Sequence, residues 1–147
     1  MRLFLLLILL LVLAAPGHAE DRLWSAVVIA SNKPHPVAPP DELKPFAPRL
    51  KRLFGYNQFE IIGTDVKPIE ENAELTLFPT QTFWFNLKAR YSNVKEVRGG
   101  CLLNLELHHD KRTLVDSVAM IAPDSPLVFR GPLHARGQIL ILLQVLP

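Results

Sequence analysis

The sequence predicts a mainly β protein, an antiparallel β-sandwich of about eight short strands with one short N-terminal helix. Two observations predict this fold: apolar segments of strand length recur between closely spaced turn residues, and residues 81–91 alternate in two rows along a strand. One segment, residues 41–54, has helical spacing instead. A small barrel, or a two-layer sheet with the helix packed over one face, would satisfy the same pattern.

The first 19 residues have the features of a secretory signal peptide. Arg2 precedes an apolar run over residues 3–15, which is shorter than the roughly 18 to 20 residues of a membrane-spanning helix. Small residues, Gly17 and Ala19, stand at the positions that a signal peptidase reads. We expect cleavage after Ala19, no transmembrane span in the mature chain, and a periplasmic or extracellular location. An uncleaved N-terminal anchor is the alternative interpretation.

The remaining residues, 20–147, have the length of a single domain. These 128 residues are enough to bury an apolar core. After Arg2 is removed, 15 Lys and Arg face 14 Asp and Glu, so we do not expect nucleic acid as a partner. The single cysteine, Cys101, excludes an intramolecular disulfide. It alternates with Leu103 and Leu105, which indicates a buried thiol; a disulfide between chains is the alternative.

The first strand is expected at residues 24–31, where the sequence WSAVVIAS is apolar and rich in β-branched residues. Four prolines follow within residues 32–40. They predict an extended proline-rich connector, because proline lacks a backbone N–H and disfavours helix in the residue before it.

The amphipathic segment after the connector is expected to be a kinked or two-part helix. Asp41 is placed to cap its start, and Pro48 lies too deep for one unbroken helix. The firmer part would begin at Pro48 and stop at Gly55 in the left-handed conformation. Its apolar side consists of Leu43, Phe46, Leu50 and either Leu53 or Phe54. The basic residues Arg49, Lys51 and Arg52 predict a solvated face, with an anion-binding or membrane-surface patch as the alternative.

The stretch LKRLFGYNQFEIIG, residues 50–63, is therefore interpreted as a helix that ends at a glycine and leads into a strand. Together with the strand and proline-rich spacer before it, the later PLVFRGP and the final ILILLQVLP, it resembles small exported bacterial proteins of unknown function. The resemblance covers most of the mature chain. It supports the predicted fold and implies no activity.

The other strands follow at close spacing. They are expected at residues 56–63, 73–79, 81–91, 101–109, 112–122, 127–131 and 138–146. Asp110 and Lys111 predict a tight hairpin between two of them, and hairpins imply antiparallel pairing. The continuous apolar run of the last strand indicates a central strand or one covered on both faces.

The main candidate binding surface is one row of the strand at residues 81–91. Its members are Trp84, Asn86, Lys88 and Arg90. An aromatic and basic row of this kind would stack a sugar or a base and hold an anion. The alternative is that the apolar side of the helix covers Trp84, while Lys88 and Arg90 lie in solvent. A second candidate is the loop sequence FRGPLHARG, which carries Arg130, His134 and Arg136.

We expect no catalytic residue, no metal site and no cofactor. His108, His109 and Asp110 are consecutive, and neighbouring residues on a strand point to opposite faces, so they predict a solvent-facing hairpin end. Glu106 and His108 share a face, but two ligands make no metal site by themselves. The local motifs of hydrolases and phosphate-binding loops are absent, whereas two glycosidase acids far apart in sequence would leave no motif.

The expected function is that of a non-catalytic exported β-domain that binds or scaffolds another component of the cell envelope, for example by lending an edge strand. The partner would be an envelope protein. The alternative is a small secreted hydrolase or carbohydrate-active enzyme. An enzyme would have a concave pocket with converging titratable groups, whereas a binding domain would have an apolar patch or an open strand edge.

Overall fold

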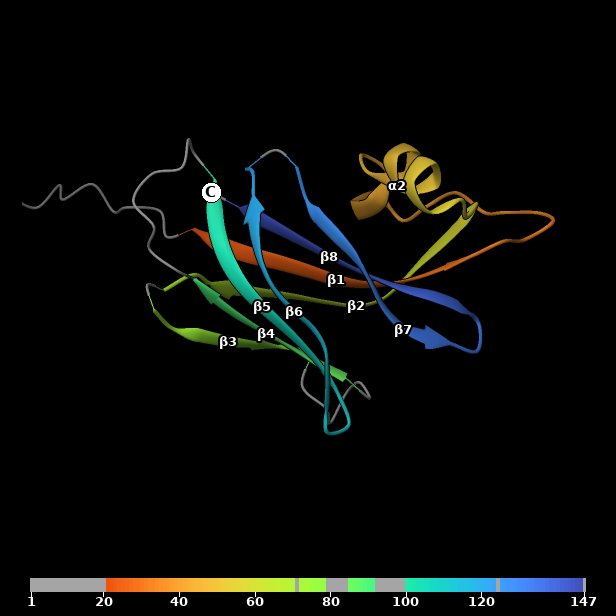
Figure 1. Ribbon diagram of the computed structural model, residues 1–147. Coiled ribbons are helices and arrows are strands. Elements are labelled where there is room, and N and C mark those ends of the chain that lie inside the picture. Colours follow the sequence, from red (N-terminus) through yellow and green to blue (C-terminus); the bar gives the residue numbers. More distant parts are fainter. Residues whose placement is uncertain (1–20, 71, 79–84, 92–99, 124, 147) are drawn as a thin grey trace, which may run out of the picture.

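The protein is built from two four-stranded antiparallel sheets (Figure 1). The computed structural model describes residues 21–70, 72–78, 85–91, 100–123 and 125–146. Sheet A has the strand order β2-β1-β8-β7, with β1 at Arg22–Ser31, β2 at Gln58–Pro68, β7 at Leu127–His134 and β8 at Gly137–Leu146. Sheet B has the order β3-β4-β5-β6, with β3 at Glu74–Leu77, β4 at Phe85–Tyr91, β5 at Cys101–His109 and β6 at Arg112–Ile121. The prediction of a mainly β, antiparallel fold is confirmed.

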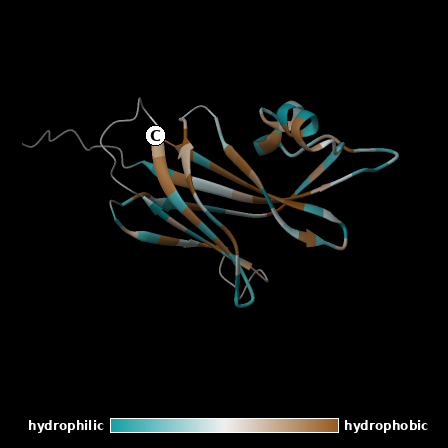
Figure 2. Ribbon diagram, viewed as in Figure 1, coloured by the Kyte–Doolittle hydropathy of each residue, from teal (hydrophilic) through white to brown (hydrophobic). Residues whose placement is uncertain are grey.

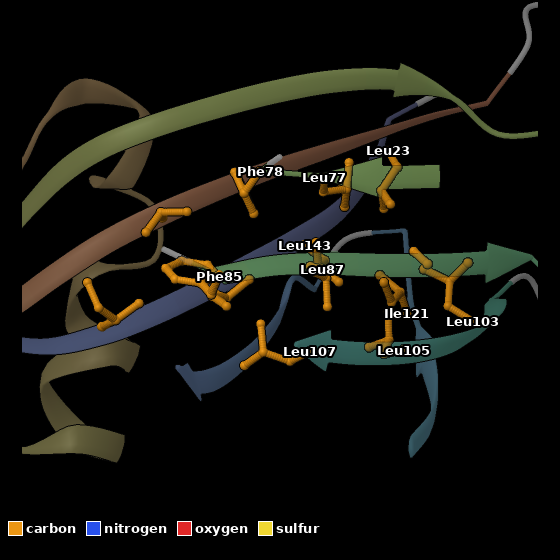
Figure 3. Close-up of a cluster of buried hydrophobic side chains, with 14 of the residues drawn as sticks. Leu23, Leu77, Phe78, Phe85, Leu87, Leu103, Leu105, Leu107, Ile121 and Leu143 are labelled. Atoms are coloured by element: carbon orange, nitrogen blue, oxygen red, sulfur yellow. The ribbon is translucent and has the colours of Figure 1, made fainter. Parts of the chain in front are cut away.

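The two sheets pack face to face around one apolar core (Figure 3). On β4, Phe85, Leu87 and Ala89 are buried in this core, so the alternation read from the sequence is confirmed over the described part of that strand. The core combines side chains of both sheets, among them Leu23, Ile29, Ile141 and Leu143 from sheet A and Leu103, Leu105 and Leu107 from sheet B. Alternate residues of each strand therefore face the other sheet.

Sheet A is covered on its second face as well. Val28 of β1 and Leu142 of β8 point away from sheet B and pack with Leu43 and Leu50 of the helical segment. All four side chains are fully buried. Figure 2 shows β1 and β8 as apolar where they approach α2, the helix at Ala47–Phe54. The sequence predicted that the last strand is central or is covered on both faces. β8 meets both descriptions, which explains its continuous apolar run.

The helix follows β1 along the chain and is not N-terminal, which corrects the predicted placement. The physical reason is that Arg22–Ser31 is an apolar, β-branched segment that forms a central strand, and the prolines after it delay any helix. The helical segment has two parts, a 3₁₀ turn at Asp41–Leu43 and α2 at Ala47–Phe54. The expected break in the helix is therefore present.

Of the two cap residues predicted for the helical segment, the structure has the one at the C-terminal end. Gly55 has φ of 74° and donates its N–H to the carbonyl of Lys51 at 2.9 Å, as expected for a left-handed stop. The prediction that Asp41 caps the start is wrong. Pro40 holds the cap position, and the carboxylate of Asp41 forms an ion pair with Lys44 instead.

Asn57, just before β2, and Gln58, its first residue, hold the proline-rich connector by hydrogen bonds. Asn57 accepts the Lys33 N–H at 2.9 Å and donates its side-chain amide to the Lys33 carbonyl at 3.0 Å. Gln58 accepts the Val37 N–H at 2.8 Å. The YNQ sequence after Gly55 thus has an architectural role, because it ties the connector to the sheet.

Two strands extend beyond their predicted ends. β2 continues through Pro68, and β7 continues through Pro132 to His134, where a register shift between Arg130 and Leu133 accommodates the proline. The hairpin between β5 and β6 is confirmed, with Asp110 at φ of 54°. Asparagine and aspartate tolerate this conformation better than other side chains with a Cβ atom.

Candidate functional site

The predicted binding row lies on the outer face of sheet B, as far as the structure describes it. Trp84 lies outside the described residues. Asn86, Lys88 and Arg90 alternate with the buried residues of β4 and therefore point away from the core. Because α2 packs on the outer face of sheet A, it does not cover this row.

The two basic residues of the row are paired with one acid. Glu74 of β3 contacts Lys88 Nζ with Oε1 at 3.2 Å and Arg90 Nη2 with Oε2 at 3.2 Å. The hydrogen bond and positive charge of Lys88, reinforced by Arg90, hold the pKa of the Glu74 carboxyl below its usual range. The row therefore presents little free positive charge to an anion.

The same face contains a shallow hollow of about 160 Å³. It is lined by Glu74, Lys88, Arg90, Asn104, Glu106 and Asp116. Glu106 and Asp116 stand opposite each other on β5 and β6. Both side chains are exposed to solvent. The hollow is therefore lined by charged side chains that face solvent, several of them in ion pairs with one another.

Among the described members of the row, Asn86 has an unusual environment. Its Oδ1 atom is buried and has no hydrogen-bond partner among the described residues. On the neighbouring strand, His108 lies opposite Asn86 and bonds Glu106 Oε2 through Nε2 at 3.0 Å. Nδ1 of His108 lies 3.3 Å from Thr113 Oγ1, so both ring nitrogens of this histidine are engaged.

The histidine pair does not form a metal site in the described part of the chain. His109 Nε2 lies 3.8 Å from Asp110 Oδ2, on the other side of the strand from His108. No group of three or more His, Cys, Asp or Glu side chains converges among the described residues. The hairpin end carries polar pairs, as the opposite orientation of neighbouring strand residues predicts.

The basic residues of the FRGPLHARG loop are dispersed. Arg130 stacks its guanidinium over the Phe54 ring at 5.7 Å from the centroid, which joins β7 to α2. Arg136 bonds Glu60 on the opposite edge strand of sheet A at 3.3 Å, and its N–H donates to His134 Nδ1 at 3.0 Å. Their separate partners indicate that they stabilise the fold and do not form one binding site.

Cys101 is a free thiol at the start of β5 and is half-buried against the common core. Burial, with a smaller effect of the negative charge of Asp21, raises its pKa to about 11. A thiol with so high a pKa is a weak nucleophile at neutral pH. Cys101 therefore acts as a small apolar side chain.

The outer face of β6 was not identified from the sequence. Leu114, Val118 and Met120 are exposed to 45%, 61% and 48% and lie in one row along the edge of sheet B, with Asp116 between Leu114 and Val118. Strand β5 pairs with one side of β6, and no described strand pairs with its other side. The sequence of β6, RTLVDSVAMI, has apolar residues in both alternating rows. Since one row faces the core, such a pattern indicates that the other row exposes apolar side chains or buries them against a partner.

Comparison with protein families, with characterised proteins and with solved structures found no match to this chain. Neither described helix has the length and apolar character needed to cross a bilayer.

Proposed function

We propose that the chain is a non-catalytic exported β-domain that binds a protein component of the cell envelope through the free edge of β6. One observation carries the proposal: β6 is a ten-residue edge strand whose outer row exposes Leu114, Val118 and Met120, with Asp116 between Leu114 and Val118. An unpaired edge offers N–H and C=O groups to an added strand, and the three apolar side chains offer contact area to the side chains of that strand.

The other sheet edges carry features that discourage strand addition. β3 is four residues long. β2 has a register shift and ends in Lys67 and Pro68, and β7 has a register shift at Pro132. The pairing of β6 with β5 also has a register shift, at Leu114, but it is regular from Val115 to Ile121, a stretch that contains Asp116 and no lysine, arginine or proline. Since protein edges are ordinarily blunted by such devices, β6 is the edge best suited to a partner.

Export is the part of the proposal that rests on the sequence. The leader-like residues 1–19 support it, and the described residues, which bring no set of buried titratable groups together, fit a binding role in the envelope. A secreted glycan hydrolase is the second candidate, because Glu106 and Asp116 face the same hollow. Loss of glycan hydrolysis in Glu106→Gln, with the fold intact, would favour that candidate.

The test is an affinity capture of the tagged protein after gentle crosslinking in its native cells, with bound proteins identified by mass spectrometry. Val118→Lys places a charge on the β6 edge, at a position exposed enough to keep the fold. Leu133→Lys is the matched control, since Leu133 is 83% exposed and lies on β7. We expect one envelope protein to be recovered with the unaltered chain and Leu133→Lys and to be lost with Val118→Lys. Equal recovery with both variants, or no partner, would contradict the proposal.

A further inference from the structure

The helical segment covers only one end of the outer face of sheet A (Figure 1). The covered end includes Val28 and Leu142. Toward the start of β1, the outer row continues with Val66, Trp24 and Gln144, which stand opposite one another on β2, β1 and β8. Val66 is 46% exposed. The described residues thus leave half of this sheet face uncovered, directly beside the helical segment.

A groove of about 530 Å³ lies where this uncovered half meets the helical segment. Its floor is formed by Trp24, Gln144 and Leu146 of sheet A, and its wall by Asp41, Glu42, Pro45 and Phe46. Trp24 and Phe46 are partly buried against the apolar cluster beneath the helix, so both aromatic rings are held by packing. A groove with a firm apolar lining suits an apolar ligand group.

The charged groups of the groove favour a positively charged ligand. Asp41 and Glu42 place two carboxylates on the wall. Asp41 is paired with Lys44, whereas Glu42 has no ion-pair or hydrogen-bond partner among the described residues. A cation beside Glu42 would also lie near the aromatic rings of Trp24 and Phe46, whose faces attract positive charge. An anionic ligand would meet the carboxylates and be repelled.

We propose that this groove binds a segment of a partner protein in which apolar side chains stand next to a lysine or an arginine. The apolar side chains contact Trp24, Phe46 and Leu146, and the basic side chain pairs with Glu42. The site is independent of the β6 edge, because it lies on the outer face of sheet A and β6 belongs to sheet B.

The experiment is a selection of phage-displayed random peptides on the immobilised protein, followed by fluorescence anisotropy with the enriched peptides. We expect enriched sequences that combine apolar residues with lysine or arginine. Glu42→Lys reverses a charge on an exposed side chain and is expected to weaken their binding about tenfold or more, because like charges then meet. Higher salt is expected to weaken binding to the unaltered protein as well.

Two control variants distinguish binding in this groove from nonspecific binding and from binding at the β6 edge. Val118→Lys should leave peptide affinity unchanged, because that residue lies on the other sheet. Trp24→Leu removes the indole but keeps an apolar side chain, and we expect weaker binding by a chain whose circular dichroism spectrum is that of the unaltered protein. Failure to enrich any peptide, enrichment of peptides without basic residues, or affinity unchanged by Glu42→Lys would overturn the proposal. Displacement of the peptides by a neutral glycan would also overturn it, in favour of a sugar site.

Discussion

Two glycines with positive φ shape the chain for different reasons. Gly55 has φ of 74° and ends α2, and a Cβ atom placed on it would meet nothing within 4 Å. Gly137 has φ of 154° in the β7–β8 hairpin, and a Cβ atom there would lie 2.3 Å from the Ala30 carbonyl oxygen. The first position requires only backbone freedom, whereas the second also requires the absence of a side chain.

Alanine substitutions should separate these two requirements. Gly55→Ala is expected to lower the free energy of unfolding by about 1 kcal/mol, the cost of a left-handed conformation with a Cβ atom. Gly137→Ala should lower it by about 3 kcal/mol, since β8 must also move away from β1. Urea unfolding followed by circular dichroism measures both values. Equal effects of the two substitutions would contradict this explanation.

The Glu74 ion pairs make a prediction about pH. Because the pKa of Glu74 is lower in the folded chain than its ordinary value of 4.5, the ion pairs stabilise the fold above that pH and are lost as the pH falls through the folded value. Lys88→Met should raise the Glu74 pKa more than Arg90→Met, because Lys88 has the larger effect. A carboxyl NMR titration measures the change, and an unaltered titration in Lys88→Met would refute the assignment.

At the scale of elements, α2 stabilises the fold through one side only. Leu50 is fully buried beneath the helix, whereas Leu53, three residues later, is 53% exposed. Phe54 is half-buried against the same cluster as Leu50, so it, and not Leu53, completes the apolar side predicted from the sequence. The helix and sheet A therefore meet along a single apolar stripe.

A pair of leucine substitutions tests this orientation. Leu50→Ala should lower the free energy of unfolding by about 3 kcal/mol, because it leaves a cavity between helix and sheet. Leu53→Ala should change it by less than about 0.5 kcal/mol, as expected for a surface position. Chemical denaturation of both variants provides the measurement. A larger loss from Leu53→Ala would mean that α2 packs in another orientation.

At the scale of the whole molecule, the two sheets share one core and β1 lies between β2 and β8. The first and the last described strands therefore pair with each other at the centre of sheet A, and the core side chains of sheet B pack against them. A structure closed in this way is expected to unfold as one unit.

This expectation is tested with one substitution in each sheet. Ile141→Ala in sheet A and Leu105→Ala in sheet B should each lower the free energy of unfolding by about 3 kcal/mol, since both side chains lie in the common core. Circular dichroism and tryptophan fluorescence should report one coincident transition in each variant. Two separated transitions would show that the sheets unfold independently.

The sequence alone determined the features that depend on near neighbours. The alternation in FNLKARY identified which side of β4 is buried, and Gly55 marked the end of α2, because a strand repeats every two residues and a left-handed turn favours glycine. The continuous apolar run of the last strand likewise indicated a position with neighbours on both faces.

Only the tertiary structure decided which surfaces are left open. The order of strands depends on contacts between segments far apart in sequence, so no local pattern shows that β6 lies at an edge or that α2 covers half of sheet A. For the same reason, the sequence does not show that Glu74 lies beside Lys88 and Arg90 and forms ion pairs with both. The periodicity of the sequence predicts which side chains are buried, but the packing of the whole chain decides which elements cover them.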